Sequence, residues 1–479
     1  MAEQTLKEKT AKGLFWGGIS NGIQQILSLI FGIILARILN ASDYGLVSML
    51  AVFSAIASTI QESGFTAALV NQQDVQHKDY NAVFWFSSLV SILFYGILFF
   101  AAPLIARFYE KPELILLSRI VFLGFLFGGF GIASSAYLFK SLMVRERAKV
   151  DITSILLSGV VGVILALNGY TYIALAIQSV VYISLNSLLI LYYAPWHPTF
   201  HLDFTPLKKM FGFSSKLFFT NIVTQIGNNI FSVILGKFYS AKQVGYYSQG
   251  NKWMTMGYGQ IVRMISGVAQ PVFIQLIHDE DRLIAALRKM FRFGAFISFP
   301  VLLGLAFVSK EFIIITIGEK WLPSVIFLQL FCIWGAFAYM ISLYTNLLIA
   351  YGLSDIYFKG IVGTLIVQLI VLVIFYKMGI YIMLCSYIFV SLLSIYWWHT
   401  RVCKILNFQF ILILKDVLPY LFVLLFSFMT AYAFCYNISN NYLLLILKII
   451  ISGILYLTIL WLAGSKILKE SVSFICKNE

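Results

Sequence analysis

The feature that most constrains this chain is a series of long apolar segments, each about as long as a membrane-crossing helix. Such a helix needs about 20 predominantly apolar residues. We place fourteen of these segments in the 479 residues. They are residues 13–36, 43–67, 82–107, 113–139, 150–168, 170–193, 209–236, 243–275, 290–309, 323–350, 357–376, 379–400, 417–435 and 442–464. The sequence therefore predicts an all-α polytopic membrane protein with about fourteen transmembrane helices.

Composition excludes most other classes of protein. The chain is 60% hydrophobic and 11% charged, whereas soluble domains are about 45–50% apolar and about 25% charged. A disordered chain, a disulfide scaffold and a soluble enzyme are therefore excluded. The five cysteines show no CxxC spacing and predict neither a disulfide nor a metal site. We expect no cofactor.

The distribution of Lys and Arg predicts the orientation in the membrane. With the N-terminus inside, 21 of the 34 basic residues fall in cytoplasmic segments and 8 in outer segments. Excess Lys and Arg marks cytoplasmic loops, so we expect both termini in the cytoplasm, and the net charge of +14 needs no nucleic-acid partner. The first span is long and carries Asn21, Gln24 and Gln25, so we do not interpret it as a cleaved signal peptide.

An internal repeat indicates duplication. Residues 21–45 align without a gap to residues 221–245, and nine of the 25 positions are identical, including Asn21/Asn221, Gln25/Gln225 and Gly45/Gly245. Six spans separate the copies, so both enter the membrane in the same direction and the repeat is parallel. We therefore expect two six-helix lobes around a central cavity, at residues 1–206 and 207–405, with two additional helices in residues 406–479.

Polar stripes run along the first two helices of each predicted lobe. A polar residue in the bilayer usually faces a watery cavity or another polar group. In the second lobe, helical spacing places Gln249, Lys252, Gln260 and Arg263 on one face, and Lys216, Asn221, Gln225 and Asn228 along the preceding helix. In the first lobe, Asn21 and Gln25 share a face. We expect these side chains to line the central cavity, although hydrogen bonding between helices is an alternative for the amides.

The charged residues within the spans are mostly basic. Glu62 is the carboxylate that we place inside a span, and it is our candidate for ion coupling. Arg119 and Lys448 are expected to snorkel towards the membrane surface. Residues 279–293 are interpreted as an amphipathic helix lying on the membrane. A cavity with several cations and few acids predicts an anionic ligand, such as a diphosphate. The rings of Tyr246, Tyr247, Trp253 and Tyr258 lie close by in the sequence and aromatic rings can stack on sugars, but in a chain that is 16% aromatic their presence proves little.

These features resemble a known family through several sequence stretches. They are LARILNASDYGLVSM at 35–49, GFTAAL at 64–69, NAVFW at 81–85, the 221–252 repeat and GEKW at 318–321. Over residues 10–400 the chain is similar to Wzx-type polysaccharide flippases of the multidrug/oligosaccharidyl-lipid/polysaccharide exporter superfamily. It looks most like the lipopolysaccharide biosynthesis proteins of the colanic-acid-exporter type.

The resemblance implies a function that the residues alone do not. It implies a transporter, not an enzyme, that moves undecaprenyl-diphosphate-linked oligosaccharide across the bacterial inner membrane by alternating access. Membrane lipids, a polymerase and a chain-length regulator are the partners that it implies. A multidrug or cation exporter of the same superfamily and a membrane-bound polysaccharide polymerase are the alternatives. The exporter would want more cavity carboxylates, and the polymerase a larger outer loop.

Overall fold

The computed structural model describes the backbone of residues 6–62 and 65–476. The side chains of residues 6–15, 67, 209, 211–217, 471–472 and 474–476 are outside the described set. Every regular element within the described ranges is helical. The chain forms two compact units, residues 1–245 and 246–479. The all-α fold class is thus confirmed, while the lobe boundaries expected from the sequence stay a prediction.

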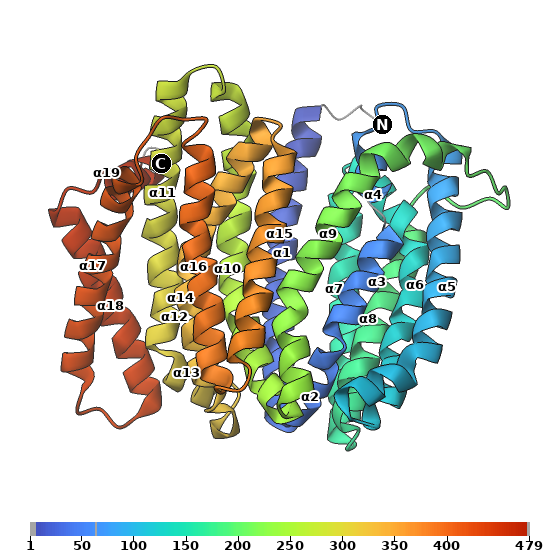
Figure 1. Cartoon of the computed structure of the whole chain (residues 1–479), viewed down its shortest axis with the longest axis horizontal. Helices are drawn as coiled ribbons and strands as arrows, with labels where there is room; N and C mark the ends of the chain where they lie inside the picture. The colour runs from blue at the N-terminus through green and yellow to red at the C-terminus, as the bar shows by residue number, and fades with distance from the viewer. Residues whose placement is uncertain (1–5, 63–64, 477–479) are drawn as a thin grey trace. The chain divides into compact units, whose positions relative to one another are not determined.

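The first unit consists of nine helices and the start of a tenth (Figure 1). They are α1 (Leu6–Ile38), α2 (Ala41–Met49), α3 (Ala51–Glu62), α4 (Phe65–Asn71), α5 (His77–Tyr109), α6 (Glu113–Lys140), α7 (Val144–Leu167), α8 (Thr171–Tyr193), α9 (Thr205–Phe238) and α10 (Ala241–Leu276). The long helices α5 to α8 form the body of this unit, with α6 packed against both α5 and α8, and α7 against α8. α1 packs against α7.

The second unit continues from α10 to the last described residues. Its elements are α11 (Glu280–Ser298), a π-helical turn (Phe299–Leu303), α12 (Gly304–Phe307), α13 (Ser309–Thr316), a 3₁₀ turn (Glu319–Trp321), α14 (Ser324–Ala350), α15 (Ser354–Phe375), α16 (Ile380–Val402), α17 (Phe410–Cys435), α18 (Asn441–Leu462) and α19 (Lys466–Cys476). α14 lies at the core of this unit, because it packs against α11, α12, α13, α15 and α16.

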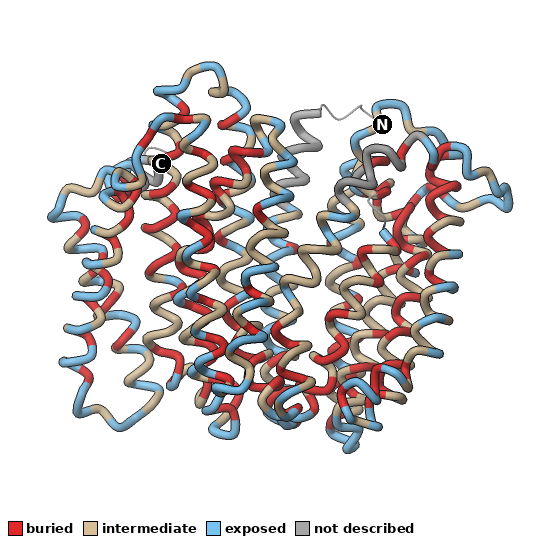
Figure 2. The backbone as a smooth tube through the Cα atoms, in the orientation of Figure 1, coloured by how far each residue is buried: buried red, intermediate tan, exposed pale blue. Residues whose placement is uncertain are grey.

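Within the described residues, thirteen helical segments are long and apolar enough to cross a membrane. The fourteenth segment expected from the sequence, 243–275, is one continuous 36-residue helix, α10, but it is not among the thirteen. Many residues of α17 and α18 are exposed (Figure 2). They include large apolar side chains, since Phe422, Met429 and Trp461 are 63%, 71% and 62% exposed. In a bilayer, such side chains would contact lipid tails and would not be exposed to water.

Two of the sequence stretches that carry the family resemblance have clear structural roles. In the stretch 35–49, Asp43 accepts a hydrogen bond of 2.9 Å from the backbone N–H of Asn40 and so caps α2. In the stretch 81–85, Asn81 holds the connection between α8 and α9. Its amide donates to the carbonyl of His201 at 2.6 Å and accepts from the N–H of Thr199 at 2.9 Å. Both contacts fix local backbone geometry.

The two identical glycines of the repeat, Gly45 and Gly245, lie where two backbone segments approach closely. A Cβ added to Gly45 would collide with the carbonyl of Ala241, and one added to Gly245 would collide with the carbonyl of Ala41. The start of α2 and the start of α10 therefore approach backbone to backbone, and the contact is reciprocal. Only glycine permits so close an approach, which explains why Ala and Gly recur in register in the two copies.

The interpretation of residues 279–293 as a helix lying on the membrane is wrong. α11 continues into the π-helical turn and α12, and its apolar side chains Leu283, Leu287 and Phe291 are all fully buried. They are buried because α11 packs against α14 and α17. The hydrophobic periodicity therefore predicts the apolar face correctly, but that face meets protein and not lipid.

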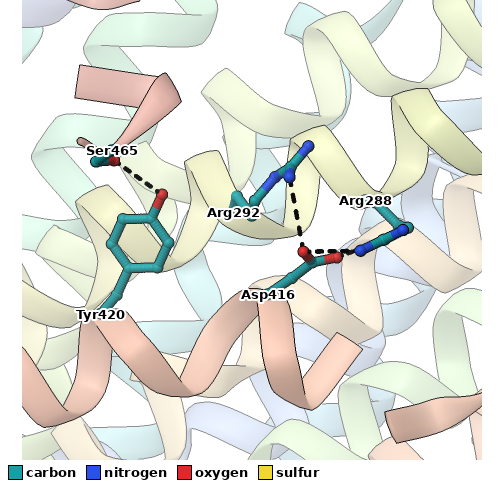
Figure 3. A network of polar contacts seen from close by, with 5 residues as sticks. All are labelled: Arg288, Arg292, Asp416, Tyr420 and Ser465. Atoms are coloured by element: carbon teal, nitrogen blue, oxygen red, sulfur yellow. Dashed lines mark hydrogen bonds and ion pairs between the residues drawn. The ribbon is translucent and has the colours of Figure 1, made fainter. Parts of the chain in front are cut away.

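The polar face of α11 is held by an ion-pair network (Figure 3). Asp416 on α17 is 7% exposed and accepts hydrogen bonds from Arg288 at 2.7 and 3.1 Å. Arg292, one turn further along α11, lies 3.6 Å from Oδ1 of the same carboxylate. Beside this network the Tyr420 and Ser465 hydroxyls are 3.2 Å apart. The network fastens α17 to the body of the second unit.

Lys448 is a further correction to the sequence analysis. It does not snorkel to the membrane surface, because it is 7% exposed and its Nζ lies 2.8 Å from Oε1 of Glu311, which is itself 4% exposed. Arg119 lies with its guanidinium 4.3 Å from the ring centroid of Phe99. Pairing, and not snorkelling, accommodates the Lys448 charge.

Candidate functional site

The first unit contains a large polar cavity, with a volume of about 840 Å³. Ligand pockets usually measure about 300–1,000 Å³. Six helices contribute its walls, namely α3, α4, α6, α7, α8 and α9. Its lining residues are Ser58, Thr59, Glu62, Thr66, Val70, Asn71, Gly128, Gly131, Ile132, Ser135, Phe139, Arg147, Asn186, Ser187, Ile190, Asn221 and Gln225. This cavity is our candidate site.

Three of the side chains that the sequence predicts to be functional line this cavity. Asn221 and Gln225 stand one turn apart on α9, and Glu62 is the last residue of α3. Asn221 and Glu62 are exposed, while Gln225 is half-buried. The amides and the carboxylate thus border the same space. Their roles in binding and ion coupling stay a prediction.

Arg147 is a lining residue that is not among the site residues predicted from the sequence, where it is counted only with the basic residues of the cytoplasmic segments. It is exposed, lies in the first turn of α7 and borders the cavity. Among the described residues it forms no ion pair with Glu62 or any other carboxylate. An arginine beside several amides offers planar, charged hydrogen-bond donors to an anion.

Asp151 is a second residue that sequence reasoning missed, although it stands at the start of the expected span 150–168. Its carboxylate accepts hydrogen bonds from Asn186 on α8 at 3.0 Å and from Gln24 on α1 at 3.3 Å. Asp151 also follows Arg147 by one helical turn. It therefore orients the cavity residue Asn186. The signal available in the sequence was its four-residue spacing from Arg147.

Not all the predicted residues of the first unit belong to this wall. On α1, Asn21 is exposed and Gln25 is half-buried. Neither is among the described residues that line the cavity. The neighbouring Gln24 makes the contact from α1 to Asp151. Asn228 is exposed on α9. The side chain of Lys216 lies outside the described residues.

The predicted residues on α10 belong to the second unit. Gln249 is 1% exposed, and neither atom of its amide has a hydrogen-bond partner among the described residues. The Nζ of Lys252 lies 5.8 Å from the ring centroid of Trp253. Gln260 and Arg263 are exposed. Within the described part of the chain neither Lys252 nor Arg263 forms an ion pair.

Three of the four aromatic rings noted near α10 in the sequence are buried in packing contacts. Tyr246, Tyr247 and Trp253 are 9%, 5% and 4% exposed. They pack edge-on against Trp321, Phe331 and Phe312, with centroids 6.0, 5.1 and 5.0 Å apart. Aromatic pairs of this geometry stabilise a protein core. The high aromatic content around α10 therefore reflects packing.

The fold and this site together define a polytopic helical membrane protein with a polar, partly basic internal cavity. The chain belongs to the polysaccharide biosynthesis protein family, whose model matches residues 34–326. It is 27% identical to the teichuronic acid biosynthesis protein TuaB of Bacillus subtilis, over 76% of this chain and 75% of that protein. It is 24% identical to the lipopolysaccharide biosynthesis protein WzxC of Escherichia coli, over 74% and 73% of the two chains.

Solved structures agree on the fold. The lipid II flippase MurJ in an inward closed conformation superposes with a TM-score of 0.76 at 16% identity, covering 92% of this chain and 97% of that one. The Vibrio cholerae MATE transporter VcmN superposes with a TM-score of 0.55 at 11% identity, over 85% and 100% of the two chains. At such identities the likeness establishes the fold alone, so function must be argued from the site.

Proposed function

We propose that this chain is a flippase that moves polyprenyl-diphosphate-linked oligosaccharide across the bacterial inner membrane. The observation that carries the proposal is the 840 Å³ cavity with Arg147 and the amides of Asn186, Asn221 and Gln225 on its wall. Membership of the polysaccharide biosynthesis protein family supports the substrate class. The fold shared with a lipid II flippase supports the mode of action.

In this proposal the cavity recognises the polar head of the lipid-linked glycan. Arg147 binds the diphosphate, because charge-assisted bonds from arginine to phosphate are strong in a site of low dielectric. The amide side chains bind sugar hydroxyls. Lys252 and Arg263 of α10, which form no ion pair among the described residues, are further cations available to an anionic head group during transport.

The remaining elements of the proposal come from the sequence. Both termini face the cytoplasm, and transport proceeds by alternating access without covalent change to the lipid, so the chain is a transporter and not an enzyme. Glu62 is the candidate for ion coupling. A ligand or ion drives such a cycle only if it binds the two states with different affinity. A polymerase and a chain-length regulator act with it in glycan assembly.

The direct test uses cells that lack this protein but retain the glycan-assembly enzymes. The lipid-linked intermediate is assayed on each membrane face, with wild type or with Lys252→Ala/Arg263→Ala added back. We expect it to accumulate on the cytoplasmic face, to be cleared by wild type and to persist with the double variant. Lys242→Ala, an exposed cation at the start of the same helix, is the matched control. Clearance without the protein would refute the proposal.

A cation or drug exporter is the second candidate. Two carboxylates favour it, namely Glu62 on the cavity wall and Asp151 directly behind Asn186. The test is efflux of ethidium from cells expressing wild type or Glu62→Gln. Export that depends on Glu62, combined with a normal distribution of the lipid-linked intermediate in cells without the protein, would favour this candidate over the flippase.

A further inference from the structure

The second unit contains a smaller pocket that the proposed function does not use. Its volume is about 350 Å³, and it lies where the loop between α17 and α18 approaches α12, α13 and α14. It is lined by Phe307, Ser309, Lys310, Glu311, Gln329, Tyr432, Cys435, Tyr436, Ile438, Leu444 and Lys448. The pocket is large enough for a small ligand.

A buried carboxylate with one unpaired oxygen lines this pocket. Oε1 of Glu311 is paired with Lys448 at 2.8 Å. Oε2 is also buried, and it has no hydrogen-bond partner among the described residues. A buried polar atom without a hydrogen-bond partner destabilises the fold. The pocket therefore presents a strong acceptor that a ligand with a hydrogen-bond donor would satisfy.

The charges around Glu311 restrict what that donor can be. The two buried charges of the lining, the Glu311 carboxylate and the Lys448 ammonium, balance each other, and the third charged lining residue, Lys310, is exposed to solvent. The buried pair therefore does not call for a charged ligand. A metal ion would be repelled by the ammonium 2.8 Å from the carboxylate, and an apolar ligand would leave Oε2 unpaired. A neutral hydroxyl is the donor that fits, because O–H···O⁻ bonds are short and strong.

The remaining contacts indicate more than one hydroxyl. Lys448 has three N–H donors, of which the bond to Glu311 uses one, so it can donate to a hydroxyl next to the first. Tyr432 and Tyr436 lie at the pocket with their ring centroids 6.2 Å apart, and they are 55% and 73% exposed. Exposed rings beside a hydroxyl-binding pair suit the apolar face of a sugar ring.

We infer that this pocket is a carbohydrate-binding subsite, in which vicinal hydroxyls of a sugar bind Glu311 and Lys448 while the ring contacts Tyr432. The choice of a sugar over other hydroxylated molecules rests on the proposed function. The geometry of the site is observed independently of that function. The subsite is separate from the cavity of the first unit and can bind a sugar without transport.

The test measures binding to the full chain in lipid nanodiscs. The probes are the methyl glycosides of glucose, galactose, rhamnose and N-acetylglucosamine, followed by saturation-transfer NMR. We expect saturable transfer to at least one glycoside, with a Kd on the order of 1 mM. Glycerol and glycerophosphoethanolamine are the controls for a lipid headgroup. Transfer to glycerophosphoethanolamine with none to any glycoside would overturn the proposal in favour of a lipid site.

Three variants assign the signal to the pocket. Glu311→Gln should weaken binding roughly tenfold, because it removes the charged acceptor. Tyr432→Ala should weaken it roughly two- to tenfold and leaves the ion pair intact, so it covers the case in which Glu311→Gln fails to fold. Glu319→Gln, an exposed carboxylate in the α13–α14 connection, should bind as wild type. Equal binding by wild type and Tyr432→Ala would overturn the proposal.

Two further measurements separate the possible sources and the two proposals. A soluble prenyl-diphosphate sugar should displace the glycoside if the sugar belongs to the lipid-linked substrate. Displacement only by a diphosphate-free oligosaccharide would assign the subsite to released glycan. Because binding is measured without transport, wild-type binding combined with unchanged lipid distribution in cells would refute the flippase alone.

Discussion

Charged residues inside the two units differ in whether they are paired. In the first unit, Arg147, Asn221 and Gln225 line an 840 Å³ cavity, and Arg147 has no ion-pair partner among the described residues. In the second unit, Asp416 and Lys448 are buried in ion pairs that fasten α17 and α18 to the helices before them. The charge of Arg147 is thus open to the cavity, whereas those of Asp416 and Lys448 are neutralised. Lys252 and Arg263 of the second unit, which form no ion pair among the described residues, resemble Arg147 in this respect.

This difference distinguishes structural charges from functional charges in a membrane protein. A buried pair satisfies its own electrostatic needs, so removing one partner should affect stability first. A cation on a cavity wall without an ion-pair partner contributes less to stability than a buried pair does, so its removal should affect ligand binding first. Variants of both kinds of charge test this separation.

The largest effect should follow from breaking the Lys448–Glu311 pair. Lys448→Met leaves a buried carboxylate uncompensated and should destabilise the fold by roughly 3–5 kcal/mol. Thermal unfolding in detergent measures this. The double variant Lys448→Met/Glu311→Leu should recover most of the loss, because no lone charge remains. A single variant as stable as wild type would mean that the pair is not structural.

The close approach in the first unit should give the next largest effect. Gly45→Ala drives a methyl group against the carbonyl of Ala241 and should cost about 1–3 kcal/mol through overpacking. Gly22→Ala on α1, where a Cβ meets nothing within 4 Å, is the control and should be neutral or slightly stabilising. The same thermal measurement compares the two, and equal stability would show that α2 and α10 can separate.

Arg147→Gln should reduce transport without reducing stability. Loss of a charge-assisted contact to the diphosphate predicts a roughly tenfold lower rate of clearance of the lipid-linked intermediate. Arg145→Gln, two residues earlier on α7, is the control because Arg145 does not line the cavity. If Arg147→Gln instead lowers the melting temperature and transports normally, the contrast between open and paired charge fails.

The smallest effect belongs to an exposed ion pair of the first unit. Lys237 donates a hydrogen bond of 2.7 Å to Glu110 and thereby lowers the pKa of that carboxyl below its usual range. The contact therefore stabilises the fold above the ordinary carboxyl pKa of about 4.3 and is lost as the pH falls through the lowered value. Glu110→Gln should lower the melting temperature slightly at pH 7. That difference should shrink as the pH falls below about 4, and a difference that grows with acid would contradict the assignment.

Much of the fold could be predicted from hydropathy, because each helix must satisfy its own backbone hydrogen bonds in lipid. α10 shows the limit of that signal. Its polar stripe makes it too polar to count among the thirteen apolar spans, although it is a continuous helix. The repeat showed Gly45 and Gly245 to be identical in register, but the close backbone approach that requires glycine there is visible only in the structure.

The ion pairs could not be predicted, because periodicity within a helix does not say which helices are neighbours. Glu311 and Lys448 are 137 residues apart, and Arg288 and Asp416 are 128 residues apart. The role of Arg147 in the cavity wall could not be predicted for a similar reason. A charge count assigns the residues at the end of a span to the loop, whereas the first turn of α7 already borders the cavity.

The ion pairs that hold α17 and α18 also limit how the protein can be shortened. Loss of residues 406–479 would take away Asp416 and Lys448 but leave Arg288, Arg292 and Glu311 behind. Three charges would then lack the partners that hold them in this structure. A shortened chain should therefore need Arg288, Arg292 and Glu311 replaced by uncharged residues at the same time, because the last two helices carry the counter-charges of the helices before them.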